Sequence, residues 1–412
     1  MGSDIQLFAN NLYVMCKPAG AMCNLACDYC YYLEKKSLYS GAGRAMVMDD
    51  RTLERFVKLY IECQTTPAVM FTWHGGEPLM RPIAFYRKAL QLQRKYAGGR
   101  HIENSIQTNG TLLTDDWCRF LHDNGFLVGI SIDGTREMHD CFRHDARGGS
   151  SFHQVMRGIE MLQRHKVEFN VMATVNSANA DKPAEFYRFF RDAGCHYIQF
   201  TPIVERYSHD GKLLHYGSEE RGELAAFSVR PEQWGDFLCG VYDEWIKEDV
   251  GTYYVQMFDS TLANWVGVEP GVCTMARQCG HAAVMEHNGD VYSCDHFVFP
   301  EFKLGNIHHD TLIEMMFSSK QKAFASIKEG KLTRQCRECQ WLFACHGECP
   351  RNRFATSEDG EQGHNYLCAG YRKFFKHAAP TMDFMKNEYA NNRPPANVMR
   401  WLRETGGKQQ NH

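Results

Sequence analysis

Three cysteines near the N-terminus, Cys23, Cys27 and Cys30, have types and spacing that could do chemistry. They are close enough for one short loop to direct three thiolates at one inorganic centre. Thiolates are soft ligands that bind iron–sulfur clusters and zinc. A structural zinc site has four protein ligands, whereas a four-iron cluster held by three cysteines leaves one iron open. The segment therefore favours such a cluster; a zinc loop with a distant fourth ligand and three unrelated buried cysteines are the alternatives.

A second group of cysteines lies in the C-terminal half of the chain. Its eight thiols make two sets of four, the number that two cubane clusters need, and they are Cys273, Cys279, Cys294, Cys336, Cys339, Cys345, Cys349 and Cys368. Four thiolates can also bind zinc, so these residues alone favour neither metal. The other six cysteines lie singly in apolar patterns, where we expect small buried side chains; they are Cys16, Cys63, Cys118, Cys141, Cys195 and Cys239.

The first cysteine segment, followed by the aromatic Tyr31, resembles the motif of the radical S-adenosylmethionine (SAM) superfamily, in which SAM chelates the open iron. The segment His74-Gly-Gly-Glu-Pro78 resembles the loop that binds the methionyl amino group in that family. The resemblance implies iron–sulfur rather than zinc chemistry. It also implies a set of SAM contacts: Tyr29, Gly75, Gly76, Glu77, Ser131, Arg143 and Val204.

Three of these contacts have more specific implied roles. Tyr29 and Val204 would lie near the adenine of SAM. Arg143 would meet the SAM carboxylate, which the planar guanidinium matches in geometry. A solvated surface arginine is the alternative for Arg143.

The later cysteines closely resemble those of a SPASM domain, the twin-cluster domain of radical SAM enzymes that modify peptides and proteins. In that family the two ligand sets interlace along the sequence. The resemblance assigns one [4Fe-4S] cluster to Cys273, Cys279, Cys294 and Cys349. It assigns another to Cys336, Cys339, Cys345 and Cys368, so that the chain would carry three [4Fe-4S] clusters and SAM.

Several segments narrow the resemblance to the anaerobic sulfatase-maturating enzymes. They are CNLACDYCYY, FTWHGGEP, SIQTNGTLL, FLVGISIDG and the final cysteine set, and the resemblance runs from about residue 10 to about residue 380. That family places its general base at the position of Asp295, directly after Cys294. The implied activity is radical oxidation of one cysteine or serine of a sulfatase to Cα-formylglycine, which activates the sulfatase under anaerobic conditions. A carboxylate that only accepts backbone hydrogen bonds is the alternative for Asp295.

Electron counting explains why such an enzyme needs its second half. The oxidation removes two electrons, and the 5′-deoxyadenosyl radical formed from SAM takes only one, as part of a hydrogen atom. Asp295 would take the proton of the substrate thiol or hydroxyl, and an auxiliary cluster would accept the other electron. The expected partners are an unfolded sulfatase segment and an electron donor such as flavodoxin or ferredoxin.

Two other functions stay open from the sequence. One is another SPASM maturase, which would form thioether or carbon–carbon crosslinks in a ribosomal peptide. The other is a non-catalytic zinc scaffold that binds a partner protein.

Six strand–helix units up to about residue 205 would position the motifs of the first half. Apolar runs such as Val69–Trp73 and Phe126–Ile132 alternate with helical patterns, and each unusual motif directly follows a strand. Repeated βα units predict a parallel sheet with right-handed crossovers. Active sites of βα barrels form at the C-terminal ends of the strands, so we expect the motifs to meet at one mouth. The predicted fold class is α/β, a partial, TIM-like (β/α)6 barrel followed by a cysteine-rich SPASM domain.

We expect the radical SAM barrel over residues 10–230, the SPASM domain over residues 231–380 and a polar tail over residues 381–412. Segment 205–229 is polar and mixed in charge. It is either a surface loop or a wall over the barrel mouth that contacts a polymeric substrate.

Three local patterns predict details of helices. Thr114 is expected to be an N-cap, and Ser151 with Gln154 has the spacing of a capping box. A further helix is expected to bury its three phenylalanines, which are Phe186, Phe189 and Phe190.

Composition and charge favour a cytoplasmic protein. The 412 residues include 46 basic and 49 acidic side chains, for a formal net charge of −3, which offers no binding surface typical of nucleic acid or anionic membrane partners. We see no signal peptide pattern and no apolar run long enough to span a bilayer. Seventeen cysteines without a secretion signal favour metal or redox chemistry over a disulfide scaffold.

Overall fold

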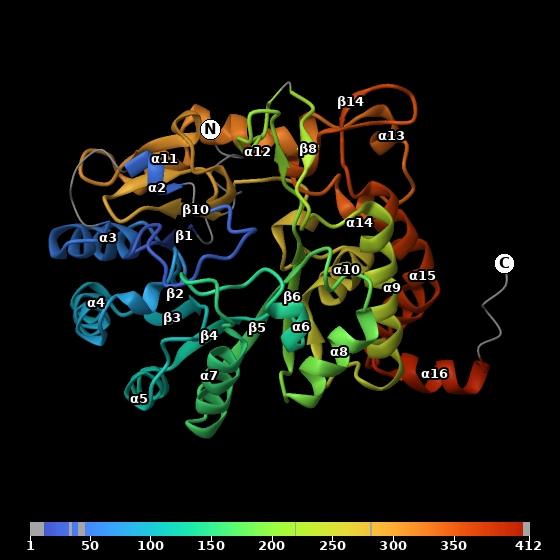
Figure 1. Ribbon diagram of the computed structural model, residues 1–412, viewed down its shortest axis with the longest axis horizontal. Coiled ribbons are helices and arrows are strands. Elements are labelled where there is room, and N and C mark those ends of the chain that lie inside the picture. Colours follow the sequence, from blue (N-terminus) through green and yellow to red (C-terminus); the bar gives the residue numbers. More distant parts are fainter. Residues whose placement is uncertain (1–11, 33–34, 40–45, 219, 281, 407–412) are drawn as a thin grey trace. The chain divides into compact units, whose positions relative to one another are not determined.

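The computed structural model describes residues 12–32, 35–39, 46–218, 220–280 and 282–406 (Figure 1). The chain forms two compact units that interleave along the sequence. The first unit comprises Met1–Ser131, Phe142–Phe169 and Cys279–Ser326, and the second comprises Ile132–Cys141, Asn170–Gln278 and Ile327–His412. Residues 10 and 11, where we expected the barrel to begin, and residues 407–412 of the expected tail lie outside the described residues.

A mixed sheet forms the centre of the first unit. Its strands lie in the order β12-β11-β10-β1-β2-β3-β4. They are β1 (Tyr13–Cys16), β2 (Ala68–Trp73), β3 (His101–Thr108), β4 (Phe126–Ser131), β10 (Ala282–Met285), β11 (Asp290–Tyr292) and β12 (Lys303–Asn306). Strands β10, β1, β2, β3 and β4 are parallel, and β11 and β12 are antiparallel to their neighbours. The predicted order of alternating strands and helices thus holds for β1 to β4. The neighbour of β1 on its other side is β10, which is distant from it in sequence.

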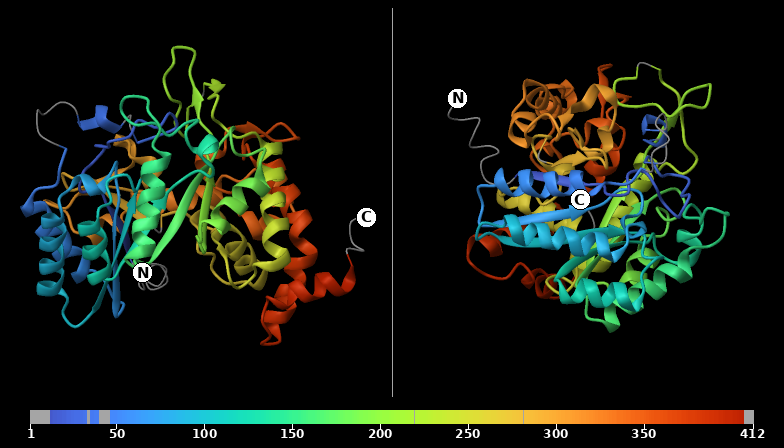
Figure 2. Two further views of the ribbon diagram at one scale, coloured as in Figure 1. Left: turned by 60° about the horizontal axis from the view of Figure 1, so that its bottom comes forward. Right: turned by 90° about the vertical axis from the view of Figure 1, so that its left-hand side faces the viewer.

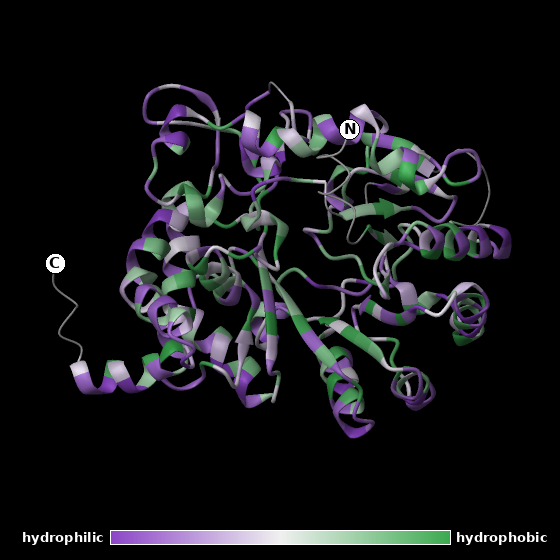
Figure 3. Cartoon of the chain, turned by 180° about the vertical axis from the view of Figure 1, so that it is seen from behind, coloured by the Kyte–Doolittle hydropathy of each residue, from purple (hydrophilic) through white to green (hydrophobic). Residues whose placement is uncertain are grey.

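The first unit also contains a set of helices. They are α2 (Lys36–Tyr39), α3 (Asp50–Glu62), α4 (Ile83–Tyr96), α5 (Asp115–Asp123), α7 (Phe152–Arg164) and α11 (Leu312–Met316), and α12 (Ser319–Gly330) begins here. The right-hand view of Figure 2 shows α3 and α4 side by side in blue. Helix α3 carries both hydrophilic and hydrophobic residues in Figure 3 and buries Phe56 against Phe71 and Trp73 of β2.

One of the two N-cap predictions in this unit is confirmed and the other is wrong. Thr114 caps α5, because its hydroxyl accepts a hydrogen bond of 3.3 Å from the Trp117 amide. Ser151 precedes α7 but its side chain does not cap the helix. Its hydroxyl instead donates to the carbonyl of Arg143, 3.1 Å away, and so ties the start of α7 to the segment that holds Arg143.

The second unit contains a further parallel ladder and most of the later helices. Strands β5 (Phe169–Val175), β6 (Tyr197–Pro202) and β9 (Tyr254–Val255) pair in parallel, and all of β5 except its first residue lies in this unit. Two small antiparallel pairs are β7 (Arg206–Tyr207) with β8 (Glu223–Leu224) and β13 (Ala355–Thr356) with β14 (Gln362–His364). The helices are α6 (Arg136–His139), α8 (Pro183–Asp192), α9 (Pro231–Glu248), α10 (Gln256–Val266), α13 (Arg334–Arg337), α14 (Leu342–Cys345), α15 (Cys368–Ala390) and α16 (Asn397–Thr405).

The buried face of α8 differs from the prediction by one residue. Phe186 and Phe190 are buried as expected, together with Tyr187, whereas Phe189 is only half-buried. Tyr187 lies inside because its hydroxyl donates to the Asp249 carboxylate at 2.8 Å.

Segment 205–229 is anchored at its start to the cysteine-rich part of the second unit. The Glu205 carboxylate pairs with Arg351, and both side chains are largely buried. The Arg206 guanidinium lies 4.0 Å from the ring centroid of Phe354 and donates to the carbonyls of Glu220 and Arg221. Its contact with a polymeric substrate stays a prediction.

None of the helices in the described ranges has the length and apolarity that crossing a membrane requires.

Candidate active site

The cysteine loop lies in the first unit, directly after β1, where its backbone is held in place. The amide of Ala26 donates to the His144 carbonyl at 2.9 Å, and that of Asp28 donates to the Phe142 carbonyl at 3.0 Å. The Cys23 sulfur receives hydrogen bonds from the Leu25 amide at 3.4 Å and from Asn109 Nδ2 at 3.7 Å. Hydrogen bonds to cysteine sulfur are a known means of stabilising and tuning iron–sulfur clusters. The three-thiol loop therefore fits such a cluster.

The glycine-rich loop after β2 lies against the segment that leads into the cysteine loop. The Gly76 amide donates to the Gly20 carbonyl, and the next amide donates to the Met22 carbonyl, both at 2.8 Å. A β-carbon at Gly76 would lie 2.1 Å from that carbonyl oxygen. Gly75 has a φ of +128°, which side chains disfavour. Both glycines are thus needed for this close approach.

The Glu77 side chain joins two of the predicted motifs. It is fully buried, and its carboxylate accepts hydrogen bonds of 2.8 Å from the Leu79 amide, the Thr108 hydroxyl and the Asn109 amide. Burial raises the pKa of Glu77 to about 7, against the opposing effect of these hydrogen bonds. The Glu77 carboxylate therefore holds the GGEP and QTNG loops together.

The structure places three other predicted SAM contacts in the first unit. Ser131 ends β4, and its hydroxyl accepts a hydrogen bond from Gln107 Nε2 at 3.1 Å. The Arg143 guanidinium lies 5.5 Å from the ring centroid of Tyr29. Arg143 is buried, so the alternative of a solvated surface arginine is wrong. Val204 follows β6 in the second unit and is also buried.

Asp295 lies in a polar cluster of the first unit. It begins a short 3₁₀ turn directly after Cys294. Its carboxylate pairs with the fully buried Lys17 and accepts a hydrogen bond from the Tyr31 hydroxyl. Burial alone would raise the pKa of Asp295, but Lys17 and the neighbouring histidines His74 and His296 hold it well below its usual range. Asp295 is therefore a carboxylate anion at neutral pH, with side chains as its partners.

Two imidazoles lie beside this carboxylate. Burial lowers the pKa of His74 to about 4, and His74 Nδ1 accepts a hydrogen bond of 2.7 Å from the Gly75 amide. Burial also lowers the pKa of His296, whose ring lies 4.7 Å from that of Tyr31. Both rings are neutral at pH 7, so Lys17 is the main positive charge next to Asp295.

Four cysteines of the second unit surround one cavity. The cavity has a volume of about 380 Å³, and its lining includes Cys336, Cys339, Cys345 and Cys368. Burial, and then repulsion from the other three sulfurs, raises the pKa of Cys368 to about 12. Among the residues that the structure describes, no set of three His, Cys, Asp or Glu side chains is arranged to hold a single metal ion.

Hydrogen bonds reach three of these four sulfurs. The Trp341 amide donates to Cys339 and the Gly347 amide donates to Cys345, both at 3.4 Å. His364 Nδ1 lies 3.6 Å from the Cys336 sulfur. A common cavity lined by four thiols with polar hydrogens directed at the sulfurs fits an iron–sulfur cluster.

The other predicted set of four cysteines is divided between the two units. Cys279 and Cys294 belong to the first unit, and Cys273 and Cys349 belong to the second. The buried ammonium of Lys328 donates to the carbonyls of Cys273 and Thr274 at 2.8 and 2.7 Å. The assignment of these four residues to one cluster stays a prediction.

Sequence reasoning missed Lys17, Asn109 and Glu286 as site residues. Asn109 lies in the noted QTNG segment, but its bond to Cys23 depends on the folded loops. Lys17 and Glu286 directly follow β1 and β10 and are both fully buried. The sequence signal that could have indicated Lys17 and Glu286 is a charged residue directly after an apolar strand.

Known proteins are similar to the chain over most of its length. Family models match it over residues 18–190, the radical SAM superfamily, and over residues 273–340, the SPASM iron–sulfur cluster-binding domain. A serine-type anaerobic sulfatase-maturating enzyme of Bacteroides thetaiotaomicron is 60% identical over 400 residues, which cover 96% of each chain. A cysteine-type enzyme of Clostridium perfringens is 33% identical over 377 residues, covering 90% of this chain and 97% of that one.

A solved structure is also similar. It is described as native anSMEcpe with bound AdoMet and Cp18Cys peptide, and it matches with a TM-score of 0.80 and 31% identity, covering 92% of this chain and 99% of that chain. These similarities confirm the predicted fold class, a radical SAM domain followed by a SPASM domain. They also confirm that the chain is an enzyme rather than a zinc scaffold. The chain therefore belongs to the anaerobic sulfatase-maturating enzymes of the radical SAM superfamily.

Proposed function

We propose that this enzyme oxidises a serine of a sulfatase to Cα-formylglycine, and a cysteine at the same position less efficiently. The relative that is 60% identical is serine-type, whereas the cysteine-type relative is 33% identical. The anSMEcpe structure is described with a bound peptide, which supports an extended segment of the sulfatase as substrate. The protein's predicted cytoplasmic location belongs to this proposal.

The cofactors in this proposal are SAM and three [4Fe-4S] clusters. Cys23, Cys27 and Cys30 would hold the cluster that binds SAM. The Gly75–Glu77 backbone, Tyr29, Ser131, Arg143 and Val204 would form the SAM site, supported by the burial of Arg143 beside Tyr29. The cavity lined by four cysteines supports one auxiliary cluster, and the Cys273, Cys279, Cys294 and Cys349 set would hold the other. An external donor such as flavodoxin or ferredoxin would supply electrons.

Bound SAM supplies a 5′-deoxyadenosyl radical that removes one hydrogen atom from the β-carbon of the target residue. For serine, the hydroxyl proton and one more electron must then leave to give the aldehyde. Asp295 takes the proton, because its carboxylate is anionic and lies next to a cluster ligand. An auxiliary cluster held by cysteines of the second half would accept the electron. With cysteine the same steps give a thioaldehyde, which water converts to the aldehyde.

One observation supports the assignment of the base most strongly. Asp295 is held from two sides, by the buried ammonium of Lys17 and by the Tyr31 hydroxyl. Its partners fix the carboxylate in one orientation and keep it deprotonated, which is the state in which it can accept a proton.

An anaerobic assay tests the function. Reconstituted enzyme is incubated with SAM, a reductant and two sulfatase-derived peptides that differ only in serine or cysteine at the target position. We expect the serine peptide to lose two hydrogens, a change of about two mass units, faster than the cysteine peptide forms the aldehyde. An intramolecular crosslink in either peptide would instead favour a crosslinking maturase, and a faster cysteine reaction would contradict the serine preference.

The Asp295→Asn variant tests the base. It is expected to bind iron and SAM and to cleave SAM, but to form formylglycine at least about a hundredfold more slowly, as loss of a general base predicts. Full activity of this variant would exclude Asp295 from the role.

A further inference from the structure

We propose that Glu286 is a positioning residue for the general base: it fixes the Tyr32 ring, this ring fixes the Lys17 ammonium, and Lys17 fixes Asp295. The inference rests on the proposed role of Asp295. All four residues belong to the first unit.

The first step is the contact between Glu286 and Tyr32. Glu286 directly follows β10 and is fully buried, and its carboxylate accepts a hydrogen bond from the Tyr32 hydroxyl. Among the described residues its other oxygen has no hydrogen-bond partner, and His287 Nδ1 lies 3.9 Å from that oxygen. A buried carboxylate with so few partners costs stability. A fold that keeps it needs a compensating role for it.

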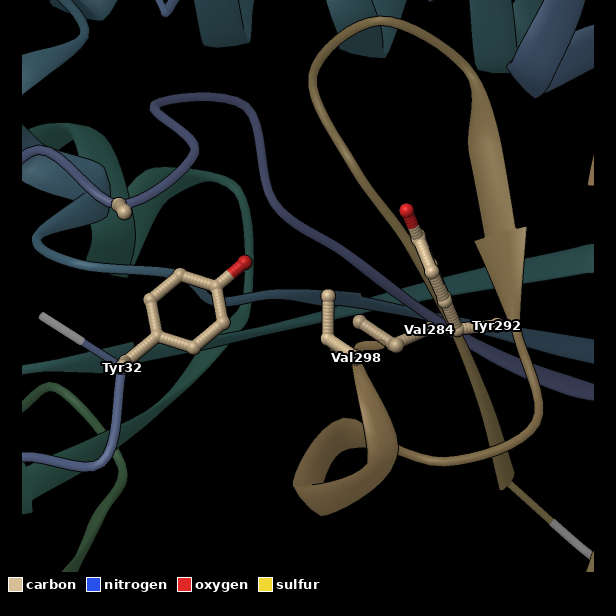
Figure 4. Packing of buried hydrophobic residues seen from close by; sticks show 5 residues of the cluster. Tyr32, Val284, Tyr292 and Val298 are labelled. Atoms are coloured by element: carbon tan, nitrogen blue, oxygen red, sulfur yellow. The ribbon is translucent and has the colours of Figure 1, made fainter. Parts of the chain in front are cut away.

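The second step is the fixed position of the Tyr32 ring. Tyr32 packs with Ala21, Val284, Tyr292 and Val298 in a buried hydrophobic cluster (Figure 4). The apolar contacts confine the ring, and the hydrogen bond to Glu286 holds its hydroxyl end in place. The negative charge of Glu286 raises the pKa of Tyr32 further above the value that burial produces, so the phenol stays protonated and remains the donor.

The third step joins Tyr32 to Lys17. The Lys17 ammonium lies 3.3 Å from the centroid of the Tyr32 ring, a cation–π contact that is strongest when water is excluded. Lys17 is fully buried. Its ammonium therefore has the ring on one side and the Asp295 carboxylate on another.

The register of the sheet explains why these charges meet. Cys16 of β1 lies opposite Met285 of β10 in the parallel pair, and the Lys17 amide donates to the Met285 carbonyl at 2.9 Å. Lys17 and Glu286 are the residues that directly follow those two strands. Lys17 and Glu286 are thus buried residues of opposite charge at equivalent positions after two neighbouring strands. The Tyr32 side chain contacts both of them.

This arrangement predicts how far SAM cleavage stays coupled to formylglycine formation when the Glu286 contact is lost. Within the part of the chain that the structure describes, the hydrogen bonds of the Cys23 sulfur and of the Gly76 amide do not involve Glu286 or Tyr32, so we expect SAM cleavage to continue when their contact is lost. Proton removal does depend on them, through Lys17 and Asp295. Loss of the Glu286 contact should therefore uncouple the reaction: SAM is still cleaved to 5′-deoxyadenosine, but less of the cleavage leads to formylglycine.

The experiment compares Glu286→Gln, Tyr32→Phe and the double variant with wild-type enzyme, using the serine peptide under anaerobic conditions. The readout is the ratio of 5′-deoxyadenosine to formylglycine. We expect Tyr32→Phe, which removes the hydroxyl donor, to raise this ratio at least about tenfold, part of the 10²–10⁴-fold that general base catalysis contributes. Glu286→Gln keeps an acceptor oxygen but loses the charge, so we expect a smaller rise. The double variant should not exceed Tyr32→Phe, because without the hydroxyl the identity of residue 286 no longer affects this contact.

Glu301→Gln is the matched control, since Glu301 is exposed and should leave the ratio unchanged. A merely structural role would lower both products together and leave the ratio at the control value, which would overturn the proposal. Tyr32→Phe keeps the ring and its packing, so it decides the question if Glu286→Gln does not fold. If wild-type enzyme cleaves SAM but forms no formylglycine, the proposed function fails instead.

Discussion

The proposed chemistry of this enzyme depends on a few buried charges whose partners are far apart in sequence. Asp295 is paired with Lys17 and bonded to Tyr31, although these residues are separated by more than 250 positions. Asp295 could be predicted from the sequence through its place beside a cluster ligand. Lys17 could not, because its partner comes near only when β1 and β10 pair. Spacing within one loop is readable from a sequence, whereas contacts between distant strands are not.

Replacement of Lys17 tests this pairing. Lys17→Met should lower the free energy of unfolding by ~3–5 kcal/mol, because it leaves a buried carboxylate without its counter-charge. It should also lower formylglycine formation. Urea unfolding under anaerobic conditions measures the first effect. The exposed Lys58, which pairs with Glu62 on α3, provides the control variant Lys58→Met, and an equal small loss in both variants would contradict the account.

The glycine-rich loop gives a steric prediction for a single residue, Gly76. In Gly76→Ala the new methyl would lie 2.1 Å from the Met22 carbonyl oxygen, so the loop must move away from the cysteine segment. We expect weaker SAM binding, measured by equilibrium dialysis with reconstituted protein. Gly99→Ala is the control for a glycine whose β-carbon meets nothing within 4 Å, and its SAM affinity should equal that of wild type.

The elements of the first unit were largely predictable because periodicity separates strands from helices. The predicted runs Val69–Trp73 and Phe126–Ile132 correspond to β2 and β4. The capping box at Ser151 failed because its hydroxyl found a tertiary partner, the Arg143 carbonyl. The pairing of β10 with β1 was not predicted, since a four-residue strand carries no signal for a partner so distant in sequence.

The anchor of segment 205–229 gives a prediction at the scale of elements. Arg351→Leu removes the partner of the buried Glu205 carboxylate and should release the segment, because an unpaired buried charge is costly. We expect faster proteolytic cleavage between residues 205 and 229. The exposed pair of Lys212 with Asp210 supplies the control Lys212→Leu, and equal cleavage rates in the two variants would count against the anchor.

Across the whole molecule, the cysteine count predicted the number of clusters, but not how the chain arranges their ligands. The four cysteines of one predicted auxiliary set line a single cavity in the second unit, and their binding of a cluster stays a prediction. The members of the other set come from both units, an interleaving that no local pattern in the sequence reveals.

Iron content tests the cluster assignment. Wild-type protein reconstituted anaerobically should be brown and hold about twelve irons if three cubane clusters are present. Cys368→Ala should lose up to about four of these irons, because it removes one ligand of the second-unit cluster. Cys239→Ala, at a half-buried cysteine outside every set, should lose none. A colourless wild-type protein with zinc would contradict all three assignments.

The most direct test of the central claim is a single anaerobic reaction of reduced, reconstituted enzyme with SAM and the serine peptide, followed by mass spectrometry. The account predicts that for each peptide that loses two hydrogens, one SAM becomes methionine and 5′-deoxyadenosine. SAM left intact, or peptide left unchanged while SAM is consumed, would contradict it.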